Sequence, residues 1–146
     1  MLSMVANGAN EETKAEMEAV LGMPVEKLNE YLYSYVRSLP SSDVCKMEIA
    51  NSIWFRSADF TVNPEFLQNN ADYYGADIYK SPFDEKTLKE INNWVKEKTD
   101  DMIPEMLDEI SDDAIMYLVN ALAFEAEWAE IYEEGTIRDG KFIKED

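Results

Sequence analysis

Apolar residues fill both alternating sets of positions in the stretch Ala114–Trp128. The odd positions carry Ile115, Tyr117, Val119, Ala121 and Ala123, and the even positions carry Met116, Leu118, Asn120, Leu122 and Phe124. Because a strand sends successive side chains to opposite faces, a strand that is apolar on both faces needs cover on both. Periodicity alone leaves a buried helix open, but the preceding Asp112-Asp113 break and the Tyr and Val content favour a strand. The pattern predicts the central strand of a layered structure of helices and sheet.

The rest of the chain shows shorter helix and strand patterns. Apolar steps of three and four residues predict helices over residues 10–22, 24–39, 63–75 and 85–102, after a helix end within residues 1–9. Alternation predicts a strand over Cys45–Phe55, where Asn51 needs hydrogen-bond partners if it is buried. Residues 104–113 form an acidic connection with room for one short helical turn.

Three tyrosines, Tyr31, Tyr33 and Tyr35, follow one flank of the second predicted helix. Two interpretations stay open for them, a binding face or packing at the helix boundary, and the second is the more usual role of aromatic side chains.

Length and charge narrow the class of protein. A chain of 146 residues suits one domain with a substantial core, and 12% aromatic content argues against disorder. With 31 acidic against 13 basic residues the net charge is -18, which disfavours binding to nucleic acid or to anionic membranes. The charge is interpreted as a solubility feature, with a basic partner surface as the alternative. No stretch approaches about 20 consecutive apolar residues, and the first residues lack the features of a signal peptide.

The residue types limit the possible chemistry. The chain has no histidine, which removes Ser-His-Asp and Cys-His machinery and the commonest zinc ligand. Cys45 has only Lys46 beside it and is predicted to be a passive thiol. No glycine-rich phosphate loop occurs, and no two carboxylates are marked as a glycosidase pair. An acidic cluster suggests calcium but lacks the spacing of an EF-hand loop, so a solvated loop is predicted. The cluster comprises Asp100, Asp101, Glu105, Asp108, Glu109, Asp112 and Asp113.

Five short motifs stand in a fixed order along the chain. They comprise Leu2, Met4, Gly8, Ala9 and Thr13; Ile49, Ala50, Asn51, Trp54 and Phe55; Tyr74, Gly75 and Ala76; Ile91, Asn92, Trp94, Val95 and Thr99; and Leu118, Val119, Asn120, Ala121, Phe124 and Trp128. In this order they resemble the serpin family of protease inhibitors. The match departs where the family has Tyr and this chain has Ala123, at Glu125-Ala126, and at Asp100–Ile103.

The resemblance implies an α+β fold. It also implies a short strand over Asp77–Phe83, after Tyr74-Gly75-Ala76, and a partly matched strand within residues 132–146, carried by Thr136 and Phe142. Residues 1–146 would form a single partial serpin domain, the N-terminal portion, with several helices packed on a mostly antiparallel part of the main sheet. The reactive loop would lie outside these residues. The expected function is therefore that of a fragment of an extracellular serine or cysteine protease inhibitor that does not inhibit alone. The target protease would be a partner of the full-length parent only.

The resemblance also assigns positions. Asn120 would lie where the family's sheet opens, and Trp128 where its reactive loop begins to insert. Without the resemblance, Asn120 reads as a satisfied buried amide and Trp128 as core. The remaining family positions, expected to be structural, are Asn51, Asn92, Trp94, Thr99 and Phe124. No catalytic residue, metal site or cofactor is expected.

An exposed strand edge on such a partial sheet predicts a homo-oligomer. The alternative function is a stand-alone interaction scaffold derived from a serpin. A third possibility is an enzyme. It would require turnover of some substrate that is abolished when a single acidic residue is substituted.

Overall fold

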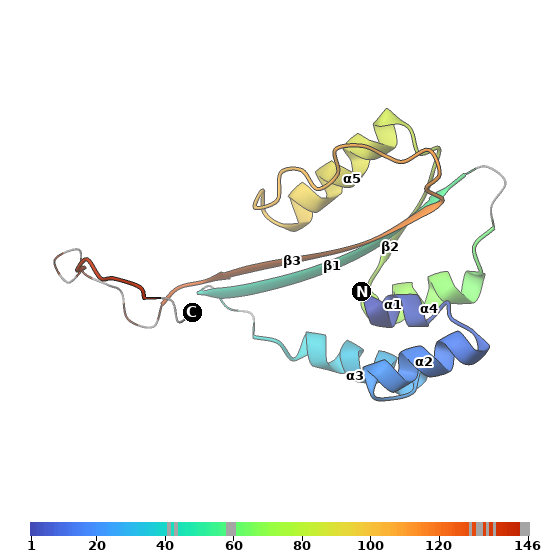
Figure 1. Cartoon of the computed structure of the whole chain (residues 1–146), viewed down its shortest axis with the longest axis horizontal. Helices are drawn as coiled ribbons and strands as arrows, with labels where there is room; N and C mark the ends of the chain where they lie inside the picture. Colours follow the sequence, from blue (N-terminus) through green and yellow to red (C-terminus); the bar gives the residue numbers. More distant parts are fainter. Residues whose placement is uncertain are drawn as a thin grey trace.

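The computed structural model describes residues 1–40, 42, 44–57, 61–128, 130, 133, 135 and 137–143. Its elements follow the predicted order of helices and strands (Figure 1). They are α1 (Leu2–Ala6), α2 (Glu11–Leu21), α3 (Val25–Arg37), β1 (Cys45–Arg56), α4 (Pro64–Tyr74), β2 (Asp77–Ser81), α5 (Glu85–Lys98) and β3 (Met116–Ala126).

The three strands form one mixed sheet in the order β2-β1-β3. β1 and β3 pair antiparallel from Cys45↔Ala126 to Phe55↔Met116. β2 pairs parallel with β1, but only opposite Ser52–Arg56. The α+β class and the dominance of antiparallel pairing are confirmed.

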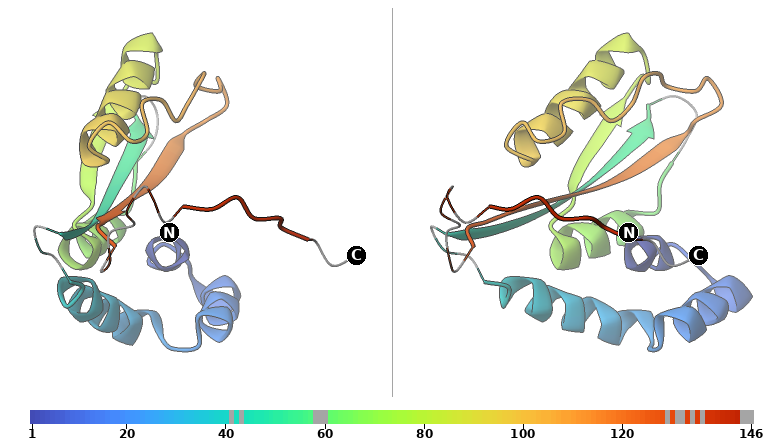
Figure 2. Two further views of the ribbon diagram at one scale, coloured as in Figure 1. Left: turned by 90° about the vertical axis from the view of Figure 1, so that its left-hand side faces the viewer. Right: turned by 60° about the vertical axis from the view of Figure 1, so that its left-hand side comes forward.

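Helices cover the sheet from both sides (Figures 1 and 2). α5 and the connection after it lie on one face, where Trp54, Ile91 and Val119 belong to one apolar core. α1 and α4 lie on the other face, where Met4, Ile53 and Phe66 belong to a second core, and α2 and α3 lie farther out. Successive residues of β1 thus enter opposite cores, as its alternation predicted.

The expected place of the strand in Ala114–Trp128 was wrong in two respects. β3 is an edge strand and β1 is central. The odd-numbered face of β3 is covered at Val119, Ala121 and Ala123, whereas Leu122 and Phe124 on the even-numbered face are 54% and 55% exposed. The apolar pattern showed that both faces could be buried but not what would lie against them. The second core reaches only Met116 and Leu118 on that face.

Several predicted boundaries shift for local reasons. The helix over 85–102 ends at Lys98, because the Thr99 hydroxyl bonds the Val95 carbonyl and Asp100 and Asp101 take φ of 47° and 63°. β2 ends at Ser81, and the Asp84 carboxylate then caps α5 by accepting the Thr87 N–H at 2.9 Å. That bond to the Thr87 backbone lowers the pKa of Asp84.

Two further expectations concern irregular segments. Residues 104–113 contain no helical turn. The last predicted strand falls partly outside the described residues, which exclude Tyr132 and Thr136. Phe142 is described and lies in irregular, exposed chain.

We predict that Ile91→Ala lowers the free energy of unfolding by about 2–5 kcal/mol, because it removes a fully buried side chain from the core under α5. Urea unfolding followed by circular dichroism measures the change. The control is Val20→Ala on α2, where the side chain is 79% exposed and the expected change is within about 0.5 kcal/mol. Equal effects of the two substitutions would contradict the packing.

Candidate functional site

Asn51 and Asn120 lie directly opposite each other on β1 and β3. In the same register, the Glu127 N–H donates to the Val44 carbonyl and the Arg56 N–H to the Ile115 carbonyl. Hydrogen-bonded pairs therefore join even residues of β1 to odd residues of β3, and Asn51–Asn120 is a non-hydrogen-bonded pair. In such pairs the Cα atoms approach to about 4.5 Å and the side chains meet. Accordingly, Asn120 Nδ2 donates to Asn51 Oδ1 at 2.7 Å.

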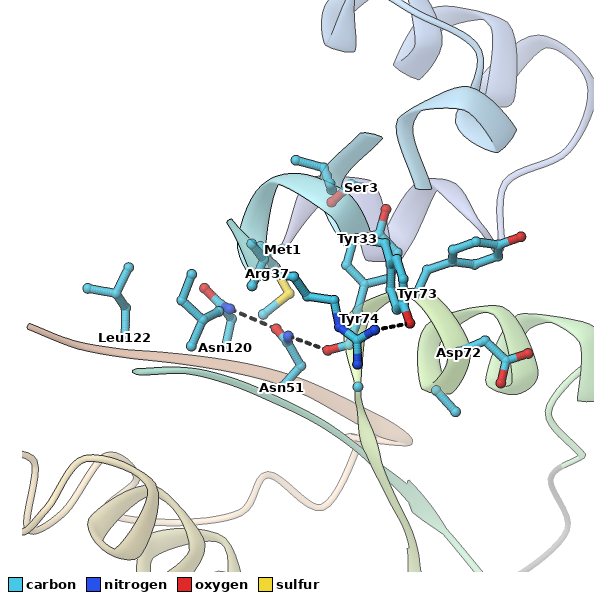
Figure 3. Close-up of a pocket in the computed structure, with 15 residues that line it drawn as sticks. Met1, Ser3, Tyr33, Arg37, Asn51, Asp72, Tyr73, Tyr74, Asn120 and Leu122 are labelled. Atoms are coloured by element: carbon cyan, nitrogen blue, oxygen red, sulfur yellow. Dashed lines mark hydrogen bonds between the residues drawn. The ribbon is translucent and has the colours of Figure 1, made fainter. Parts of the chain in front are cut away.

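Asn51 continues this contact from the sheet into the helices (Figure 3). Its Nδ2 donates to the backbone carbonyl of Tyr74 at the end of α4, at 2.8 Å. The Tyr74 hydroxyl donates to Asn29 Oδ1 on α3 at 2.6 Å, and burial raises the pKa of Tyr74. Asn29 and Asn7 exchange amide hydrogen bonds of 2.8 and 3.1 Å. A polar chain thus links both long strands to α4, α3 and the end of α1.

The sheet end of this polar chain, at Asn51, Asn120 and Tyr74, borders a cavity of about 540 Å³ between the sheet and the helices. Asn51 and Asn120 lie on the sheet side, and Tyr33 and Arg37 of α3 on the helix side (Figure 3). The Arg37 guanidinium lies over the Tyr33 ring, 4.5 Å from its centroid, and donates to the Tyr33 hydroxyl. The lining of this cavity offers amides, hydroxyls, the Arg37 guanidinium and the Asp72 carboxylate, which are groups that can bind and hold a peptide backbone.

The expected partners of Asn51 are confirmed, because it is buried and both ends of its amide are bonded. For Asn120, the interpretation as a buried, hydrogen-bonded amide is only half correct. Its side chain is bonded, but the residue is exposed.

Three of the matched positions lie on the opposite face of the sheet: Asn92 and Trp94 belong to α5, and Thr99 is its C-cap. Asn92 holds the connection after the helix, accepting the N–H groups of Met106 and Leu107 at 3.0 and 2.9 Å. Trp94 is buried, and its Nε1 donates to Asp77 Oδ2 at 2.9 Å. The Thr99 hydroxyl accepts the Ile103 N–H at 3.1 Å. These contacts fix α5 and its connection against the sheet.

Phe124 and Trp128 lie apart from the asparagine pair, towards and beyond the end of β3. Phe124 is half exposed and Trp128 is 77% exposed, so the interpretation of Trp128 as core is wrong for this chain. At about 3.3 Å per residue, an extended chain places Trp128 about 26 Å from Asn120.

The sequence analysis missed Asn7 and Asn29. Asn29 had a detectable signal, since it lies at the next helical step beside Val25, Leu28 and Leu32, within the apolar stripe of α3. A polar residue in such a stripe indicates a buried hydrogen bond. Asn7 follows α1 in a tight turn and offers no comparable pattern.

The three tyrosines of α3 divide between the two roles considered for them, packing at the helix boundary and a binding face. Tyr33 packs edge-on against Tyr73 of α4, with ring centroids 6.4 Å apart, as helix packing predicted. Tyr31 and Tyr35 stack on each other and remain exposed.

Within the part of the chain that the structure describes, no three acidic or cysteine side chains gather as metal ligands would. In the acidic cluster, Asp101 pairs instead with Lys96, at 3.3 Å from Nζ. Cys45 is half-buried at the start of β1. No described helix is long and apolar enough to cross a bilayer.

We predict that Asn51→Ala lowers the free energy of unfolding by about 1–3 kcal/mol, because the Tyr74 carbonyl and the Asn120 amide both lose a partner. Asn120→Ala should cost about 0.5–1.5 kcal/mol. The double variant should cost less than the sum, because the two residues share one bond. Urea unfolding measures all three. Additive effects, or an equal effect of the exposed control Asn93→Ala, would contradict the pairing.

The similarity to known proteins extends over the whole chain. Residues 1–146 match the family model described as Serpin (serine protease inhibitor). The leukocyte elastase inhibitor of Sus scrofa is 32% identical over 97% of this chain and 39% of its own length. The crystal structure of tengpin, a thermophilic serpin, in the latent state is 51% identical, with a TM-score of 0.89, over 92% of this chain and 37% of that one. A loop C-sheet serpin polymer matches equally well. The chain thus spans about two fifths of the length of these relatives. It carries the α+β fold of part of a serpin, and it belongs to the serpin family.

Proposed function

We propose that these residues supply the helix-covered half of the main sheet in a serpin-type inhibitor of serine or cysteine proteases. They would form a single partial domain over residues 1–146 that does not inhibit alone. The observation that carries this proposal is the open edge of β3. With odd residues bonded to β1, the backbone N–H and C=O groups of Met116, Leu118, Asn120, Leu122 and Phe124 point away from it. Among the described residues no strand pairs with this edge of β3, and an unpaired edge is suited to accept a further strand.

Asn120 lies in the middle of this open edge. Its backbone faces outward and its side chain holds Asn51, which is bonded to α4. A strand added beside β3 would therefore meet a residue whose side chain is tied to the helices. We propose that this bond sets how readily β3 moves relative to the helices when a strand enters. Trp128 lies just beyond β3 and would mark the end of this edge, where insertion of the added strand starts.

We propose no catalytic role for the chain. It has no histidine, and among the described residues no hydroxyl lining the cavity beside Asn51 and Asn120 is hydrogen-bonded to a carboxylate. The alternative of an interaction scaffold derived from a serpin is supported by the stacked, exposed pair Tyr31 and Tyr35.

We predict that the 146-residue chain neither slows leukocyte elastase nor forms a complex that survives SDS, because the three strands of its described part do not complete such a sheet. Residual activity after incubation and a denaturing gel measure this, with the porcine leukocyte elastase inhibitor as positive control. Time-dependent, stoichiometric inactivation by the chain would contradict the proposal.

The parent function is tested by the native transcript on both sides of residues 1 and 146. An open frame that continues into a hinge and reactive loop supports the inhibitor. A native start codon at residue 1 and a stop codon after residue 146 would contradict the inhibitor proposal and favour the scaffold or a decayed serpin.

We also propose that the isolated chain forms homo-oligomers through the β3 edge. Exposed Leu122 and Phe124 beside unpaired backbone favour pairing with a second copy. The net charge of -18 on each copy opposes it.

Association should therefore increase when salt shortens the Debye length from about 10 Å at 0.1 M to about 3 Å at 1 M. We predict that Leu122→Lys shifts the mass seen by size exclusion with light scattering towards monomer, because it places a charge on the edge. Val20→Lys makes the same change of charge at an exposed apolar residue of α2 and should leave the mass unchanged. A wild-type chain that stays monomeric at high concentration in both salts would contradict the proposal.

A further inference from the structure

β1 has a second open edge, on the side away from β3. β2 pairs with β1 only from Ser52↔Asp77 onward, so the earlier residues of β1 extend past β2 (Figure 1). The register that bonds even residues of β1 to β3 turns the N–H and C=O groups of Met47 and Ile49 to the opposite side. Among the described residues, no hydrogen bond reaches these groups from that side. We call residues 47–51 the β1 gap edge.

The ends of the β1 gap edge are closed by the chain itself. At one end Ser42 exchanges backbone bonds with Cys45, of 2.8 and 3.3 Å. At the other end Gly75 and Asp77 lead into β2. The gap of five residues corresponds to about 17 Å of extended chain.

A cavity of about 420 Å³ opens onto this edge. Its lining includes every residue from Met47 to Asn51, together with Val36 of α3, and Trp94 and Lys98 of α5. Since a strand presents only alternate residues to either face, five consecutive lining residues mean that the cavity faces the strand edge-on. The space is therefore placed where a further strand would lie.

The two sides of the cavity differ chemically. On the α5 side, Glu48 is exposed and forms no ion pair with any described residue, while Asp77 is already paired with Lys98 at 3.6 Å. On the α3 side the lining side chains are apolar at Val36, Met47 and Ile49, and the Asn51 amide is already bonded to Tyr74 and Asn120. Successive side chains of an added strand would meet these two sides in turn, the carboxylate and then the apolar surface.

We propose that the β1 gap edge binds an extended peptide of about five residues in which basic and apolar side chains alternate, adding as a short strand in line with β2. The backbone groups of Met47 and Ile49 supply the pairing, and Glu48 selects a basic side chain. The net charge of -18 favours a cationic peptide over a second copy of this chain. This site is separate from the β3 edge and does not depend on the inhibitor proposal.

The test uses a fluorescent peptide of alternating Val and Lys, titrated into the chain and followed by anisotropy. We expect saturable binding below about 1 mM that weakens as salt rises. The amide resonances of Met47 and Ile49 should show the largest NMR shifts. Absence of saturable binding, or shifts confined to residues 116–126 of β3, overturns the proposal.

Two matched comparisons separate edge pairing from charge attraction. Two peptides are compared, one N-methylated at its odd-numbered residues and one at its even-numbered residues. Only one of these two sets of N–H groups faces β1, so one peptide should lose binding and the other should keep it. Glu48→Gln should raise Kd by about two- to five-fold. Glu125→Gln, an exposed carboxylate on β3 opposite Lys46, should not change it. The proposal is overturned if both N-methylated peptides lose binding equally, or if both Gln variants have equal effects. It is also overturned if a peptide of alternating Val and Glu binds more tightly.

Discussion

The antiparallel pairing of β1 with β3 is the constraint on which the rest of this structure depends. It joins residues 45–55 to residues 116–126, across a stretch of chain that contains α4, β2 and α5. Its register decides which residues form close, non-hydrogen-bonded pairs, and so brings Asn51 against Asn120. A shift by one residue would move Val119 and Ala121 out of the core under α5 and break the amide contact. The two cores and the polar chain therefore share one register.

The same register defines both open edges of the sheet. Odd residues of β3 and even residues of β1 are used in the shared ladder, so the remaining backbone groups of each strand must point outward. β2 satisfies those of β1 only where it runs alongside, opposite Ser52–Arg56. What is left is a long edge on β3 bordered by apolar side chains, and a short edge on β1 bordered by a carboxylate. The different surroundings of the two edges suit them to different partners.

Elements with strong local signals were predictable from the sequence. Asn63 and Pro64 begin α4, and Gly22 and Gly75 end their helices in the left-handed conformation, as those residue types favour. The alternation over Cys45–Phe55 assigned Trp54 and Phe55 to opposite faces correctly. The order of strands was not predictable, because an apolar stretch such as 116–124 states how much it could bury and not which neighbour is present. The link from Asn51 through Tyr74 to Asn29 joins residues far apart in the chain, and no spacing rule encodes such contacts.

The charge of the chain acts on the two edges in opposite directions. A surface of net charge -18 repels a second copy at the β3 edge, where exposed Leu122 and Phe124 favour association, and attracts a cationic strand at the β1 gap edge. Salt screens both effects, and so strengthens the first association and weakens the second. The opening beside β1 is set within the described chain, because the turn at Ser42–Cys45 and the end of α4 at Gly75 delimit it. A further strand paired with β3 would leave the two ends of this opening unchanged, since it would lie at the opposite edge of the sheet from β2.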